Sequence, residues 1–124
     1  MASIKNLHLQ YRLWIAEMNA DINVLRIFDD YLAELATTSG TEKVKEHIHN
    51  FKTKFINVRK EMDDLRHEMH LNKMQLGAIA KDSKGIDENI EKEINHDNIN
   101  KRYNSYRKDF DAMRKEFQAF EANN

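Results

Sequence analysis

The chain has 124 residues and a formal net charge of −1, with no cysteine, no proline and three glycines. The absence of cysteine excludes disulfides, thiol nucleophiles and cysteine-based zinc sites. The nearly balanced charge gives no overall field that would attract nucleic acid or an anionic membrane.

The first predicted element is a long amphipathic helix over residues 4–36. An apolar residue returns every three or four positions, the period at which helices pack nearly parallel, and Ser3 is a suitable N-cap. The predicted core stripe consists of Ile4, Leu7, Tyr11, Trp14, Met18, Asp21, Leu25, Phe28, Leu32 and Leu35.

The same helix carries a second apolar line on its opposite face, which the outer helices of a bundle normally keep polar. We expect the two later helices to keep that face polar. A helix that is apolar on both faces is usually buried on both, so we predict a contact here with a second copy or with another protein. Scattered surface leucines are the alternative interpretation. The predicted interface residues are Leu9, Leu13, Ala16, Ala20 and Ile27.

A second helix is predicted over residues 41–80, after a break at residues 37–41. Ser39 and Glu42 have the spacing of a capping box, which favours a helix start at this point. Its predicted core stripe consists of Val44, Ile48, Phe51, Phe55, Val58, Met62, Leu65, Met69, Asn72, Leu76 and Ile79.

A third helix is predicted over residues 87–121, with Ser83 or Asp87 as its cap. Its stripe is clear only late in the helix, at Tyr103, Tyr106, Phe110, Met113, Phe117 and Phe120. Short breaks make consecutive helices antiparallel neighbours. The sequence therefore predicts one all-α domain over residues 1–124, an antiparallel up-down-up three-helix bundle of long helices with coiled-coil-like heptad packing. An extended hairpin that completes its core only in a dimer is the alternative architecture.

Asp21 is a charged residue within a core stripe. Counting outward from the two turns places it at the level of Arg59 and of Arg107 or Lys108. A buried carboxylate needs such a partner, and polar core residues often set the pairing of helices. We expect a register-fixing salt bridge or a position at the rim of the core, with a ligand or partner site at mid-bundle as the alternative.

Asn72 is the second polar stripe residue, and the same counting places it level with His8 and with Asn95 or His96. Two histidines and an amide are weak candidate ligands for a divalent metal. A hydrated polar layer where the core becomes thinner is the simpler interpretation, so we expect no bound metal.

The sequence contains no phosphate-binding loop motif, no nucleophile elbow motif and no catalytic thiol. We therefore expect a non-enzyme without a cofactor or small-molecule ligand. A basic line on the third helix could suggest nucleic acid, but acidic residues are interleaved with it, so no nucleic-acid partner is expected. The basic line consists of Lys101, Arg107, Lys108, Arg114 and Lys115.

The N-terminal residues lack the pattern of a signal peptide, and no stretch reaches the roughly 20 apolar residues of a membrane span, so we expect a cytoplasmic protein with no membrane association. The favoured function is a non-catalytic scaffold or protein–protein interaction module, which we expect to associate with itself through the first helix. Two alternatives stay open: a metal-binding or stress-type helical bundle protein, and a small all-helical enzyme with a charge-lined site between subunits.

The segment Trp14-Ile15-Ala16-Glu17 is similar to the Trp-Ile-x-Glu region of spectrin-like repeats. The length of the chain is also near that of one repeat, while Tyr103 stands where those repeats often have a second tryptophan. The resemblance implies a shared three-helix architecture.

Overall fold

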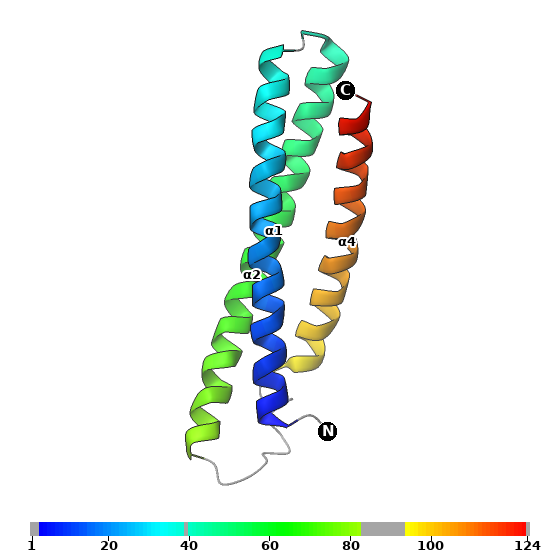
Figure 1. Ribbon diagram of the computed structural model, residues 1–124. Coiled ribbons are helices and arrows are strands. Elements are labelled where there is room, and N and C mark those ends of the chain that lie inside the picture. The colour runs from blue at the N-terminus through cyan, green and yellow to red at the C-terminus, as the bar shows by residue number, and fades with distance from the viewer. Residues whose placement is uncertain (1–2, 39, 83–93, 124) are drawn as a thin grey trace.

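The computed structural model describes residues 3–38, 40–82 and 94–123, and within these ranges it contains three long α-helices. Helix α1 spans Ile4–Thr38, α2 spans Glu42–Asp82 and α4 spans His96–Ala122. Helix α2 runs antiparallel to α1, and α4 runs beside them in the direction of α1 (Figure 1). The predicted all-α, up-down-up three-helix bundle is confirmed.

Side-chain caps mark the starts of α1 and α2. The backbone N–H of Asn6 donates to Ser3 Oγ at 3.1 Å, which confirms Ser3 as the N-cap of α1. At the start of α2, the N–H of Val44 donates to Thr41 Oγ1 at 3.3 Å. Thr41 therefore caps α2, and Ser39 lies outside the described residues.

Helix α4 begins at His96, later than the start predicted at residue 87. Ile94 and Asn95 form a turn, and Asn95 has the left-handed backbone conformation, with φ of 55°. A left-handed residue interrupts a right-handed helix, and asparagine adopts that conformation more readily than most residues. The predicted caps Ser83 and Asp87 lie outside the described part of the chain.

The core runs along the three facing sides of the helices, and every residue of the three predicted stripes is buried or half-buried. The buried side chains form one continuous hydrophobic cluster with contributions from all three helices. Full burial of a single leucine or phenylalanine side chain contributes about 1.5–3 kcal/mol, so these stripes dominate the stability of the bundle.

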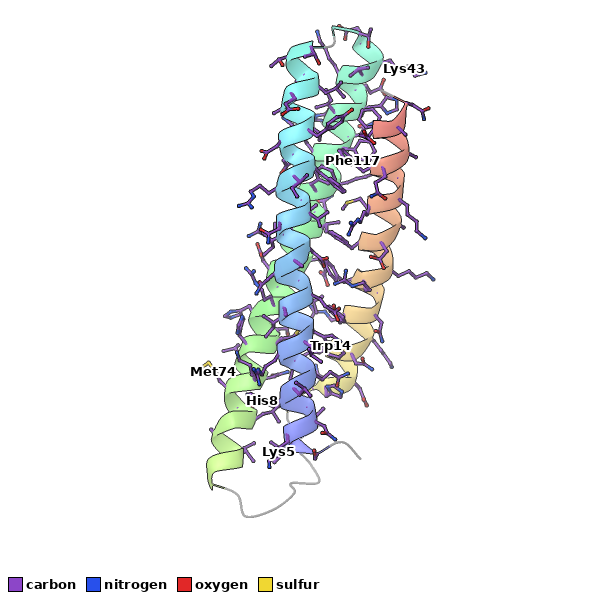
Figure 2. All side chains as sticks on the ribbon, in the orientation of Figure 1. Lys5, His8, Trp14, Lys43, Met74 and Phe117 are labelled. Atoms are coloured by element: carbon purple, nitrogen blue, oxygen red, sulfur yellow. The ribbon has the colours of Figure 1, made fainter. Side chains whose placement is uncertain are left out.

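Aromatic rings fill the core near the end at which α1 turns into α2. Phe117 of α4 stacks on Phe28 of α1 with ring centroids 4.2 Å apart, and it meets Phe51 of α2 edge-on at 5.1 Å. Figure 2 shows Phe117 directed into the space between the helices. This contact joins all three helices through one side chain.

Candidate interaction surface

The second apolar line of α1 lies on the solvent-exposed face of the helix. Leu9, Leu13 and Ile27 have exposed fractions of 50%, 54% and 62%, and Ala16 and Ala20 are also exposed. Their spacing places all five side chains on one side of α1. The structure therefore brings the five predicted interface residues together as one surface about 27 Å long, at 1.5 Å per residue from Leu9 to Ile27.

The expectation that α2 has a polar outer face is wrong at three positions. Ile56, Leu71 and Met74 are large apolar residues with exposed fractions above one half. They do not form a continuous line, because Ile56 is about 22 Å along the helix from Leu71. Met74 points away from the bundle (Figure 2). Helix α4 exposes no large apolar side chain among its described residues, as predicted.

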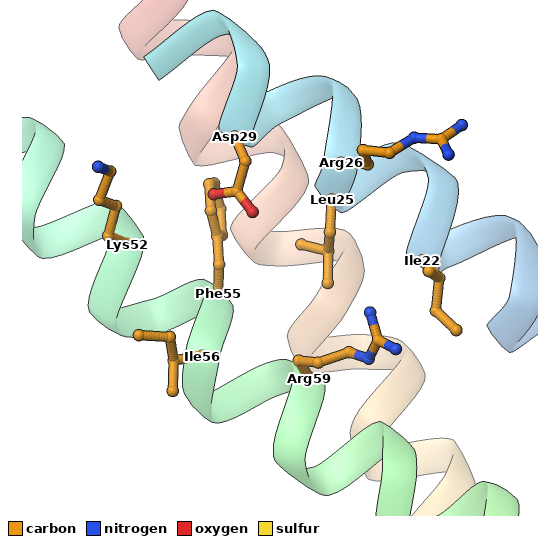
Figure 3. A pocket seen from close by; sticks show the side chains of 8 residues that line it. All are labelled: Ile22, Leu25, Arg26, Asp29, Lys52, Phe55, Ile56 and Arg59. Atoms are coloured by element: carbon orange, nitrogen blue, oxygen red, sulfur yellow. The ribbon is translucent and has the colours of Figure 1, made fainter. Parts of the chain in front are cut away.

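A groove of about 620 Å³ lies between α1 and α2, on the side away from α4 (Figure 3). Leu25 and Phe55 contribute apolar side chains to it, and Asp29 lies near Lys52 at one end. Partial burial raises the pKa of Asp29 above its ordinary value, Lys52 opposes that rise, and Asp30 adds to it.

Positive side chains also line the groove, but they do not converge on one point. Arg59 reaches between the two helices and forms an ion pair with Asp63 at 3.0 Å, whereas Arg26 points away from α2 (Figure 3). A catalytic site would need several polar groups directed at one position. The alternative of an enzyme with a site between subunits stays a prediction.

Asp21 is held at the contact between α1 and α4 by three hydrogen bonds. Arg107 donates from Nη1 to Oδ1 at 3.1 Å and from Nη2 to Oδ2 at 2.7 Å, and Tyr106 Oη donates to Oδ2 at 2.9 Å. The predicted salt bridge of Asp21 is confirmed with Arg107, one of the three residues expected at its level, whereas Arg59 pairs with Asp63. Two parallel charge-assisted bonds fix both the distance and the orientation of the pair, so they set the register of α4 on α1.

The network continues outward through tyrosine and glutamate. Arg107 Nη2 also donates to Tyr103 Oη at 2.9 Å, and Tyr103 Oη donates to Glu17. The guanidinium group lies 5.5 Å from the ring centroids of both Tyr103 and Tyr106. Arg107 Nε is buried and has no hydrogen-bond partner among the described residues. These contacts join two helices of one chain, which favours a structural role for the pair over a ligand site.

Sequence reasoning did not identify Tyr103, Tyr106 and Glu17 as partners in this network. The available signal was the presence of tyrosine within a core stripe, because a buried tyrosine hydroxyl usually needs a hydrogen-bond partner. Tyr106 also immediately precedes Arg107 in the sequence.

The two tyrosines of the network should make the stability of the protein fall at alkaline pH. Burial and the bond to Glu17 raise the pKa of Tyr103, and burial and Asp21 raise the pKa of Tyr106. The unfolded chain releases these phenol protons near pH 10 while the folded protein keeps them. The free energy of unfolding should therefore be unaffected by these groups below about pH 10 and decrease above it.

Urea unfolding from about pH 8 to about pH 12, with tyrosinate absorbance recorded in parallel, measures this effect. The variant with Tyr103→Phe and Tyr106→Phe should lose most of the decrease, because neither ring can then ionise. An identical alkaline slope in both proteins would contradict the assignment to these two residues.

The three weak metal candidates have separate surroundings. His96 Nδ1 lies 2.8 Å from Tyr11 Oη, and the His96 ring stacks parallel to Trp14. Asn72 Nδ2 donates to the carbonyl of Ile94 at 2.8 Å. His8 is half-buried at a groove between the start of α1 and the last part of α2.

No cluster of three or more histidine or acidic side chains suited to a metal occurs in residues 3–38, 40–82 and 94–123. The interaction of Asn72 with a backbone carbonyl instead fixes the turn before α4. Metal binding by His8, Asn72 and His96 stays a prediction.

The basic line of α4 does not form one continuous surface. Arg107 is directed into the network with Asp21, whereas Lys101, Lys108, Arg114 and Lys115 are exposed. None of the helices in the described ranges is both long and apolar enough to span a bilayer.

Comparisons of the chain with models of protein families, with curated proteins and with solved structures find no match.

Proposed function

We propose that this protein is a non-catalytic helical interaction module that associates with itself through the exposed apolar face of α1. The observation that carries the proposal is the exposure of Leu9, Leu13, Ala16, Ala20 and Ile27 on one side of α1. Contiguous apolar surface on a soluble protein commonly marks an interaction site, because its removal from water contributes about 25 cal/mol per Å².

The alanines add a geometric argument. Ala16 and Ala20 lie at the middle of the line, and their small side chains permit the backbones of two helices to approach closely. The larger residues Leu9, Leu13 and Ile27 lie to either side and supply the apolar area. A symmetric pair buries this face on both copies at once, and twofold dimers are the commonest form of such assemblies.

The proposal includes a cytoplasmic location. The chain contains no cysteine, so its fold depends on no disulfide and is compatible with a reducing compartment.

Leu13→Glu tests the proposal directly. The wild-type protein should sediment at micromolar concentrations with twice the chain mass of 14.7 kDa. The variant should shift toward the monomer mass, with a dissociation constant raised at least about tenfold, because a buried unpaired carboxylate is strongly unfavourable. Since Leu13 is 54% exposed, the far-UV helical signal should stay unchanged. Ala20→Glu should have the same effect.

Ile56→Glu is the matched control. Ile56 is an equally large apolar residue on α2, with an exposed fraction of 68%, and it lies outside the α1 line. This variant should keep the dimer mass. A wild-type monomer across the micromolar range, or an unchanged mass in the Leu13→Glu variant, would contradict self-association through α1.

A further inference from the structure

Four exposed charges of α1 lie beside the apolar line and are segregated along the helix, whereas the other exposed charges, Glu17, Arg26 and Asp29, lie farther around it. Lys5 and Arg12 lie near its start, and Asp30 and Glu34 lie near its end. All four are exposed, and none forms an ion pair with another described residue. Both ends of this face therefore carry charges that form no ion pair within the described part of the bundle.

This distribution is the reverse of the one that stabilises a helix by itself. A helix dipole favours acidic residues in the first turn and basic residues in the last turn, and α1 has neither. Lys5 instead lies in the first turn, and Asp30 and Glu34 lie near the negative end of the dipole. An antiparallel neighbour would have the negative end of its dipole beside the basic start of α1 and the positive end beside the acidic end of α1. The charges of α1 therefore stabilise such a neighbour better than they stabilise α1 itself.

Four of the five residues of the apolar line are placed symmetrically about residue 18, which fits the same arrangement. Leu9 and Ile27 are equally far in sequence from residue 18, and so are Ala16 and Ala20, whereas the counterpart of Leu13 is Asn23. Two copies of α1 that cross antiparallel at this level would place the Ala16 side chain of each copy opposite the partner's Ala20. Each Leu9 would face the partner's Ile27.

We infer that the occupant of the α1 face is a second copy of this chain, with the two α1 helices antiparallel about a twofold axis near residue 18. The inference rests on the proposed self-association and adds its direction and register. Lys5 then lies level with the partner's Asp30 and Glu34 at both ends of the contact. In a parallel pair, like charges would be level, and the two helix dipoles would also be aligned in the same direction.

Cysteine cross-linking distinguishes the two directions, since the natural chain has no cysteine. The single variants Leu9→Cys and Ile27→Cys are mixed in equal amounts under native conditions and oxidised, and the links are identified by peptide mass spectrometry. An antiparallel pair should form 9–27 links almost exclusively. Links of 9–9 and 27–27 are then disfavoured, because like positions are about 27 Å apart along the axis.

The same samples are analysed under reducing conditions by sedimentation equilibrium. This measurement tests whether the protein associates with itself, separately from the direction of the two α1 helices. A dimer with 9–9 and 27–27 links would overturn the antiparallel direction and leave the proposed function in place. A dimer with no link between these positions would overturn the α1 contact itself. A monomer of the wild-type protein and of both variants would overturn the proposed function together with the inference.

Charge reversal supplies an independent test. The variant with Lys5→Glu and Arg12→Glu should bind itself about tenfold more weakly than the wild type, because acidic ends then meet acidic ends. Mixing it with the variant that carries Asp30→Lys and Glu34→Lys should restore the affinity. The control carries Lys101→Glu and Lys108→Glu, an equal change of charge on α4, and should bind as the wild type does. Unchanged self-affinity of the first variant would overturn the antiparallel pairing.

Discussion

Replacement of Arg107 by methionine should lower the free energy of unfolding by about 3 kcal/mol, because it leaves the carboxylate of Asp21 buried without its charged partner. Asp21 is only 6% exposed and accepts two hydrogen bonds from the guanidinium group. Loss of one partner of a fully buried pair costs about 3–5 kcal/mol. The lower end applies here, since the Arg107 side chain keeps 27% of its surface exposed.

Urea denaturation at neutral pH measures the loss. Lys108→Met is the matched control, because Lys108 is the exposed neighbour of Arg107 on α4, and it should change the stability by less than about 0.5 kcal/mol. The double variant with Asp21→Leu and Arg107→Met should recover most of the loss, since it removes both charges together. Equal stability of the Arg107→Met and Lys108→Met variants would contradict the buried pair.

Phe117→Ala should cost about 3–5 kcal/mol, the range found when a large core side chain is deleted and its cavity only partly collapses. Phe117 is 2% exposed, and its ring contacts Phe28 from α1 and both Phe51 and Phe55 from α2. The change removes the ring that joins all three helices. Urea denaturation gives the loss, and near-UV circular dichroism reports the loosened aromatic packing.

Phe117→Leu keeps the fold measurable if the alanine variant is unfolded, and it should cost less because most of the volume is retained. Phe120 provides a position control, because it lies one turn later on the same helix and is only half-buried. Phe120→Ala should therefore cost clearly less than Phe117→Ala. Equal losses at the two positions would contradict the central place of Phe117 in the core.

Neither of these changes touches the proposed interaction surface. Asp21 and Phe28 lie on the core side of α1, whereas Leu13 and Ala20 are exposed. Variants that remain folded should therefore keep the wild-type oligomeric mass. The Leu13→Glu variant should show the opposite combination, with a lowered mass and an intact helical signal.

The helical period was sufficient to predict most of the fold. Every predicted stripe position is at least half-buried, because a repeat of three and four residues leaves only one side of each helix available for the core. The late start of α4 was not predicted, since an asparagine in left-handed geometry has no distinct periodic signal. That turn depends on a tertiary contact, the hydrogen bond from Asn72 to Ile94.

The candidate surface was predicted residue by residue from the same periodicity, and the structure shows that the described residues leave it exposed. The polar network was predicted only in part. Counting from the turns placed Arg107 level with Asp21, but axial counting does not report the direction of a side chain around the helix. It could not show that Tyr103 and Tyr106 face α1 as well.

The sequence by itself determined the helices, their order and the apolar sides of each, because these depend on local spacing along one chain. Only the tertiary structure decided which charged side chains form ion pairs between helices and which remain exposed on the surface. Arg107 is taken up by Asp21, whereas Lys5, Arg12, Asp30 and Glu34 remain exposed without ion pairs to described residues. This division depends on distances between helices, and a periodic pattern within one helix contains no information about those distances.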